Sequence, residues 1–573
     1  MPNEAKDGGS ASAGRGSAVP WHVKFFTRHR KGMPGPRYAI RLERGLRVPL
    51  PDGTCQVADV YHPVTSDPCP TLLVRSPYGR GFPYDFMYGG TFAKQGFHVV
   101  LQSARGTGGS TGTMEPFVNE AADGQAAVAW LRGQDWFNGS LGTIGASYLG
   151  FVQWALAADP PPELRAMVIQ VSADDFYGFL YPGGALALEA VLTGVAAMLS
   201  QHRGFGSFVR GMLRLTRNHK RVARAYPLLD GYRPAFGQRV PFFEEWLRHP
   251  AADDPYWEPR RAMPDIKAAP PVSLLGGWYD VVIDQTLDSY RRLREAGRPA
   301  RLVVGSWNHT SGFNKDMPVV AGEALGWFRG HLTAPGGQQP DGRPGRDSWA
   351  AGSTAKLPVR VHVSEAGGPG GWRDLADWPP PGTETRPWHP HADGTLSAEP
   401  GEGTAAFRYD PADPTPAVGG PRMDSIGHGP RRNNDLEARA DVLTFTGPPL
   451  DAPVDVIGPV SVRLRARGSG GHFDLFARLC DVDTGGTSWN VCDGILRVSD
   501  GAGWASYTVP MSSTAHRFAS GHRIRLQVSG GAHPRFARNT GTADQLPTAT
   551  RLVPVDIELS HAEAALSLPV LPA

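Results

Sequence analysis

The sequence predicts an α/β domain that is followed by an all-β domain. Up to about residue 330, short apolar runs alternate with helical patterns, which is typical of a parallel sheet covered by helices. Helical patterns alone fill residues 176–265 and interrupt this alternation. From about residue 355 onward, short alternating strands are separated by Gly/Pro turns. This last pattern predicts a β-sandwich of the jelly-roll type.

Residues 38–62 predict two strands around the turn Pro51-Asp52-Gly53. Continuous apolar runs, which predict strands buried on both faces, occupy 71–79, 97–106, 141–147, 166–172, 271–280 and 301–307. Helical patterns lie between them at 119–134, after Ser147, and at 284–297. Strands that alternate with helices in this way predict right-handed crossovers in one sheet.

These patterns give the domain boundaries. We expect a disordered leader over 1–20, because these residues are small and polar. The α/β catalytic core is expected over 21–175 and 266–334, with a helical cap inserted at 176–265. A Gly/Pro-rich linker at 335–349 leads to the β-domain at 350–573.

Composition excludes several classes of protein. Hydrophobic residues make up 40% and charged residues 20% of the chain, as in a soluble protein with a well-formed core. A net charge of +3 is too small to create the strongly positive surface that is typical of nucleic-acid-binding proteins. The longest near-apolar stretch, Ala185–Leu199, is too short to span a bilayer, and the first 20 residues lack a secretory signal. We therefore expect a cytoplasmic protein that acts on a small molecule and binds neither nucleic acid nor membrane.

Metal and cofactor motifs are weak. The four cysteines form no C-x-x-C pair, so they predict neither a disulfide framework nor a zinc site. Residues 388–393 contain H-x-H-x-D, but no further His follows, and we expect an exposed loop. The Gly-rich run 106–112 lacks the G-K-[ST] ending of a phosphate-binding loop. We expect no metal and no organic cofactor.

The informative segment for catalysis surrounds Ser147. It reads Gly145-Ala146-Ser147-Tyr148-Leu149-Gly150, after a predicted strand and at the start of a predicted helix. In this context a tight strand-to-helix turn exposes a serine hydroxyl as a nucleophile. The pattern is G-x-S-x-x-G, with Leu149 at the position where the second glycine is usual.

A serine nucleophile needs a base, and the base needs a carboxylate to orient it. In α/β-hydrolases the order along the chain is Ser, acid, His. Asp280 ends one predicted strand and His309 follows the next, which leaves one crossover helix between them. Asp174 and Asp175 also follow a strand, so the pattern alone leaves them open as the acid.

The oxyanion that forms at the acyl carbon needs two donors. The backbone N–H of Tyr148, the residue after the nucleophile, is one candidate. The second has to come from the loop after an early strand. Tyr78 lies in such a loop, in Arg75-Ser76-Pro77-Tyr78-Gly79, and offers an O–H.

Several segments resemble a known family. They are RSPYGR, SARGTGGSTG, WFNGSLGTIGASYLGFVQWALA, GGWYDVVIDQTL and VVGSWNHTSG, followed by FRYDPADPTPAVGG and GHRIRLQVSGGAHPRFARNTGT in the C-terminal part. Together they resemble the cocaine-esterase-like branch of the X-Pro dipeptidyl-peptidase family over nearly everything beyond residue 38. The resemblance implies an α/β-hydrolase core, an inserted helical cap and a C-terminal jelly roll.

The resemblance also implies the site. It favours Ser147 as nucleophile, Asp280 as acid and His309 as base, with the Tyr78 O–H and the Tyr148 N–H as oxyanion donors. We expect a serine hydrolase that cleaves carboxylic esters through an acyl-enzyme. An X-Pro dipeptidyl-peptidase, amidase or acyltransferase on the same triad is the first alternative, and a non-catalytic jelly-roll binding protein is the second.

Two departures from the family pattern bear on the substrate. Residues 103–106 read Ser-Ala-Arg-Gly, where the family often has Asp before the Arg-Gly pair. Related α-amino-acid ester hydrolases carry acidic residues just after the catalytic Asp, whereas residues 281–283 here are Val-Val-Ile. No carboxylate cluster for a free α-amine is visible there, which argues against that subgroup.

Overall fold

The structure is a computed structural model that describes residues 17–27, 32–262, 265–314, 316–332, 357–423 and 427–572. The expected linker at 335–349 and residues 1–16 of the expected leader lie outside these ranges. The Ser17 amide donates to the Leu42 carbonyl at 2.8 Å. Residue 17, which belongs to the expected leader, therefore pairs with the edge strand of the sheet.

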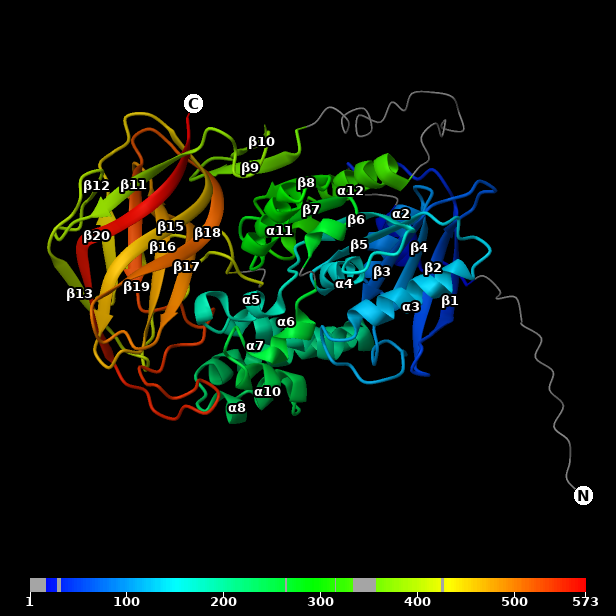
Figure 1. Cartoon of the computed structure of the whole chain (residues 1–573), viewed down its shortest axis with the longest axis horizontal. Coiled ribbons are helices and arrows are strands. Elements are labelled where there is room, and N and C mark those ends of the chain that lie inside the picture. Colours follow the sequence, from blue (N-terminus) through cyan, green and yellow to red (C-terminus); the bar gives the residue numbers. More distant parts are fainter. Residues whose placement is uncertain are drawn as a thin grey trace, which may run out of the picture.

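The α/β core contains the predicted parallel sheet (Figure 1). Its strand order is β1-β2-β4-β3-β5-β6-β7-β8, and all neighbours from β4 to β8 are parallel. β3, β4, β7 and β8 are buried at every residue, which explains their continuous apolar sequences. The strands are β1 (Ile40–Pro49), β2 (Cys55–Pro63), β3 (Thr71–Ser76), β4 (His98–Ser103), β5 (Leu141–Ala146), β6 (Leu164–Gln170), β7 (Val272–Gly277) and β8 (Ala300–Gly305).

Helices connect these strands and pack on the sheet. The N-terminal part of the core contributes α1 (Trp21–Phe26), η1 (Asp85–Gly90), α2 (Thr91–Ala93), α3 (Glu120–Arg132) and α4 (Tyr148–Ala157). The C-terminal part contributes α11 (Ile283–Glu295), η6 (Ser311–Phe313) and α12 (Met317–Leu332). Every residue of α4 is buried, so this helix lies inside the core directly after the predicted nucleophile.

A helical segment separates β6 from β7, and we call it the cap (Figure 1). It contains α5 (Phe176–Leu180), η2 (Pro182–Gly184), α6 (Leu188–Ser200), η3 (Gln201–Arg203), α7 (Phe205–Ala223), α8 (Leu228–Gly231), α9 (Arg233–Phe236), α10 (Pro241–Arg248), η4 (Pro255–Arg260) and η5 (Ile266–Ala268). Within the described ranges, no helix combines the length and the hydropathy that a bilayer crossing requires.

The C-terminal part is a β-sandwich with its own apolar core. One sheet contains β9 (Val359–Glu365), β10 (Gly371–Leu375), β11 (Glu384–Pro390), β12 (Leu396–Ser397), β13 (Thr404–Tyr409), β15 (Val454–Gly468), β18 (Ala505–Phe518) and β20 (Val555–Leu571). The other sheet contains β14 (Val442–Thr446), β16 (Phe473–Val482), β17 (Ser488–Val498) and β19 (Arg523–Ser529), and α13 (Asn434–Glu437) precedes β14.

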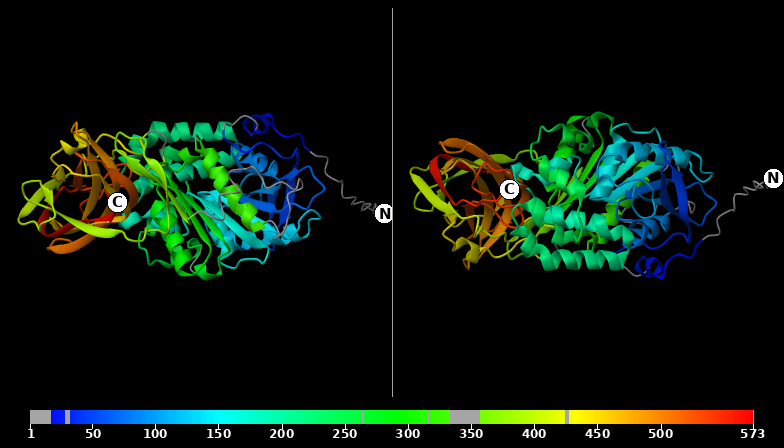
Figure 2. Two further views of the ribbon diagram at one scale, coloured as in Figure 1. Left: turned by 90° about the horizontal axis from the view of Figure 1, so that it is seen from above. Right: turned by 90° about the horizontal axis from the view of Figure 1, so that it is seen from below.

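The β-sandwich is joined to the core and to the cap, and it forms one end of the molecule (Figure 2). Strand β9 pairs in parallel with β8 of the core and with β18 of the sandwich, so one sheet runs through both parts. Arg422 donates to both carboxylate oxygens of Glu189 in the cap, at 3.0 and 2.5 Å. These links place the loop around Arg422 beside the cap.

Candidate active site

Ser147 lies at a tight turn between β5 and α4. Its backbone has φ 60° and ψ −125°, a region that non-glycine residues rarely adopt. A Cβ on Gly145 would lie 2.3 Å from the Leu149 Cβ, and one on Gly150 would lie 2.4 Å from the Ser172 Cβ. The position where a second glycine is needed is therefore residue 150 and not residue 149. Leu149 can stand where a glycine is usual because its side chain packs over Gly145.

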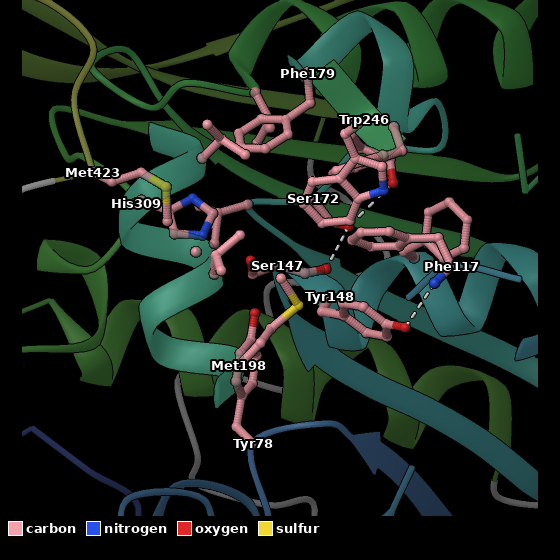
Figure 3. Close-up of a pocket in the computed structure, with 18 residues that line it drawn as sticks. Tyr78, Phe117, Ser147, Tyr148, Ser172, Phe179, Met198, Trp246, His309 and Met423 are labelled. Carbon is pink, nitrogen blue, oxygen red and sulfur yellow. Dashed lines mark hydrogen bonds between the residues drawn. The ribbon is translucent and has the colours of Figure 1, made fainter. Parts of the chain in front are cut away.

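His309 and Asp280 meet at the carboxyl ends of neighbouring strands. His309 Nδ1 and Asp280 Oδ1 are 2.8 Å apart, and both side chains are buried. Within the described residues, His309 Nε2 is buried and has no hydrogen-bond partner. His309 and Ser147 line the same cavity (Figure 3). The carboxylate thus fixes one ring nitrogen and leaves the other to accept a proton.

The other acid candidates bind other groups. Asp174 accepts from Arg292 at 2.6 Å, and burial raises the pKa of its carboxyl. Asp175 caps α5 by accepting from the Tyr177 amide at 3.0 Å. The structure therefore places Asp280 against His309. Asp174 and Asp175 instead stabilise the beginning of the cap through their own contacts.

Tyr78 lies beside Ser147, the predicted nucleophile. Its hydroxyl is within hydrogen-bonding reach of Ser147, and burial raises its pKa to about 12. The phenol therefore stays protonated at neutral pH and remains a donor. Its ring stacks on Tyr84 with centroids 6.1 Å apart, which fixes its direction. Tyr148 is the first residue of α4, so its amide N–H has no partner within the helix.

Glu120 is a supporting residue that the sequence patterns did not single out. The Tyr148 hydroxyl donates to Glu120 Oε1 at 2.8 Å, and Arg75 Nη2 donates to Oε2 at 2.9 Å. Burial raises the pKa of Glu120, and the Arg75 cation opposes that rise. The Phe117 amide in turn donates to the Tyr148 hydroxyl at 2.9 Å. This buried network holds the start of α4, and no local motif indicates it.

The cavity at Ser147 has a volume of about 70 Å³ and mostly apolar walls. An apolar cavity of about 150 Å³ can hold benzene, so this cavity of about 70 Å³ is too small for a group of that size. Flexible side chains such as Met198 or Met423 have to move before such a group can enter. Among the residues that the structure describes, no Asp, Glu, Lys or Arg lines this cavity. Its lining residues are Tyr78, Phe117, Ser147, Tyr148, Phe151, Val171, Ser172, Ala173, Phe176, Phe179, Val191, Gly194, Val195, Met198, Trp246, Val282, His309 and Met423 (Figure 3).

Metal ligands do not gather in the described parts of the chain. There, no group of three or more His, Cys, Asp or Glu side chains is placed to hold an ion. The H-x-H-x-D segment is not simply an exposed loop, because β11 extends through Pro390. His389 Nδ1 contacts the Ala564 carbonyl and His391 Nε2 contacts Ser397 Oγ, each at 2.8 Å.

Comparison with known proteins decides the family. Residues 52–311 match the family model of the X-Pro dipeptidyl-peptidase (S15 family), and residues 352–553 match that of the X-Pro dipeptidyl-peptidase C-terminal non-catalytic domain. Cocaine esterase of Rhodococcus sp. (strain MB1 Bresler) is 30% identical over 547 residues, which cover 86% of this chain and 92% of the relative. The chain belongs to the X-Pro dipeptidyl-peptidase (S15) family. It is a serine hydrolase of the cocaine-esterase-like branch.

Solved structures of other proteins share the fold of this family member. An aminopeptidase from a marine sediment Thaumarchaeota archaeon has a TM-score of 0.74 at 20% identity, with 94% of this chain and 97% of the other covered. An α-amino acid ester hydrolase has a TM-score of 0.74 at 21% identity, with 93% and 97% covered. The likeness therefore extends over the α/β core, the cap and the β-sandwich.

Proposed function

We propose that this S15-family hydrolase cleaves carboxylic esters with Ser147 as nucleophile, His309 as general base and Asp280 as the orienting acid. The supporting observation is that Ser147, His309 and Tyr78 line one cavity while Asp280 binds the far nitrogen of His309. A serine hydroxyl becomes a good nucleophile only when a base within reach accepts its proton.

The reaction has two steps. Ser147 Oγ attacks the ester carbonyl, and its proton passes to His309 Nε2. The Tyr78 O–H and the Tyr148 N–H donate to the oxyanion of the tetrahedral intermediate. His309 then protonates the leaving alcohol, and an acyl-enzyme remains on Ser147. Water activated by His309 attacks the acyl-enzyme, and the acid product is released. No step in this sequence requires a metal or an organic cofactor.

The substrate class follows from the cavity wall. A group that enters this cavity meets aromatic and aliphatic side chains, and none of the described residues that line the cavity is a carboxylate that could pair with an ammonium. We therefore propose esters whose group at the cavity is uncharged and apolar. Phe176, Val191 and Val195 come from the cap, and Met423 comes from the loop between β13 and α13 of the β-sandwich, so both parts contribute to substrate choice.

The experiment compares wild type with Ser147→Ala. Wild type should hydrolyse short p-nitrophenyl esters and be labelled once by a fluorophosphonate probe, and the variant should lose both properties. Hydrolysis that persists in Ser147→Ala would remove this residue from its role. A preference for an Ala-Pro anilide over simple esters would replace esterase by dipeptidyl-peptidase, and a folded wild type without labelling would indicate a non-catalytic protein.

A further inference from the structure

The long cap helix α7 exposes an apolar stripe. Phe205, Val209 and Leu213 are 57%, 38% and 48% exposed. Their spacing of four residues places them on one side of the helix. Buried residues of the same helix, such as Leu215 and Val222, face the protein instead. The helix therefore has a second apolar side, which is largely exposed within the described part of the chain.

Helix α1 extends this stripe. Trp21 and Phe25 are 75% and 54% exposed. The Phe82 ring connects the two helices, because it lies 6.0 Å from the His22 ring and 5.3 Å from the Phe205 ring. Figure 2 shows α1 beside the beginning of α7. We call Trp21, Phe25, Phe82, Phe205, Val209 and Leu213 the apolar patch.

The flank of the apolar patch is strongly cationic. Residues 203–224 contain seven Arg or Lys and no Asp or Glu, whereas the whole chain has a net charge of only +3. Arg210, Arg217, Lys220 and Arg221 are exposed, and none of them forms a salt bridge within the described part of the chain. Exposed cations of this density repel one another unless an anionic surface neutralises them.

We propose that the apolar patch and the cations of α7 dock on the surface of an anionic lipid bilayer, contrary to the expectation from the sequence that the protein binds no membrane. A helix with aromatic and aliphatic side chains beside Arg and Lys lies in the interface between headgroups and acyl chains. A second copy of the chain is a poorer partner, because pairing two such helices would bring their cations together. A nucleic acid would neutralise the charge but would leave Val209 and Leu213 in water.

The docking surface adjoins the site without belonging to it. Met198 of α6 lines the catalytic cavity, and α7 begins at Phe205, a short way along the chain. A Cβ on Gly79, next to Tyr78, would lie 3.2 Å from the His202 Cα. Docking would therefore hold the cavity near the lipid surface. The proposal of lipid docking stands independently of the proposed esterase activity.

The test uses the full chain and sedimentation with vesicles of phosphatidylcholine, with and without phosphatidylserine. Wild type should bind the anionic vesicles, and binding should weaken as salt is added. The triple variant Arg210→Gln/Arg217→Gln/Arg221→Gln should bind about 100-fold more weakly, since each cation near an anionic surface is worth about fivefold. The variant Phe205→Ser/Leu213→Ser should also lose binding at constant charge.

A matched control removes three exposed arginines from the β-sandwich, in Arg386→Gln/Arg408→Gln/Arg551→Gln, and should bind like wild type. A circular dichroism spectrum and a thermal unfolding midpoint like those of wild type show that every variant folds. Equal binding by the control and the helix variant would overturn the proposal. So would binding to RNA without binding to vesicles, or a dimer in light scattering that Phe205→Ser/Leu213→Ser dissociates without any vesicle binding.

Discussion

Replacing Tyr78 with phenylalanine removes one hydroxyl from beside Ser147 and leaves the ring in place. The ring stays between Tyr84 and Tyr148, whose centroids lie 6.1 and 6.4 Å away. Substrate binding should therefore change little. If Tyr78 is one of two oxyanion donors, its loss should reduce kcat by about 10²–10³, or about 2.7–4 kcal/mol of transition-state stabilisation.

The structure explains why the effect should reach this size. Tyr78 is half-buried in the wall of a mostly apolar cavity, and burial raises the pKa of its hydroxyl to about 12. A hydrogen bond to a charged oxygen is worth more there than in water. The Tyr148 amide remains in the variant, and this is why activity should fall without disappearing.

The assay is steady-state hydrolysis of p-nitrophenyl acetate, with active enzyme counted by fluorophosphonate labelling. Tyr84→Phe is the matched control, because the Tyr84 ring stacks on Tyr78. Among the described residues, its hydroxyl accepts a hydrogen bond from Gln201 Nε2 alone, at 3.4 Å. The control should keep nearly full kcat. A Tyr78→Phe enzyme with wild-type kcat, or with a raised KM and unchanged kcat, would refute the assignment of Tyr78 to the oxyanion hole.

Three further predictions follow from the same contacts. Asp280→Asn should lower kcat by about 10⁴ because the histidine is no longer held in the required tautomer, and a loss below tenfold in ester hydrolysis would contradict this. His62 and His98 pack together with their Nδ1 atoms 3.0 Å apart, and burial and the Arg41 cation lower their pKa values to about 3 and about 4. Because the unfolded chain protonates these groups near pH 6.5, stability should be full above that pH and fall by up to about 1.4 kcal/mol per histidine and pH unit below it. Urea unfolding should show a flatter pH profile in the double Gln variant, and an unchanged profile would argue against the effect. Gly150→Ala should destabilise the fold by about 1–3 kcal/mol, since its Cβ would overlap Ser172, and an unchanged Tm would show that the turn can relax.

The amino-acid sequence was sufficient to predict the strands of the core and the position of the proposed nucleophile. The continuous apolar runs of β3, β4, β7 and β8 predict burial on both faces, because a strand covered by helices has no polar side. The turn at Ser147 is equally local, since it depends on the backbone of a few residues and on glycines that let a strand and a helix approach closely.

The tertiary structure alone decided which distant groups meet. The pattern left Asp174, Asp175 and Asp280 open, and only the arrangement of neighbouring strands brings one of them within 2.8 Å of His309. Neither the support of Tyr148 by Glu120 nor the apolar patch shared by α1 and α7 has a local signal. Local sequence encodes backbone conformation and burial, whereas contacts between remote residues depend on strand order and crossovers, which no short segment contains.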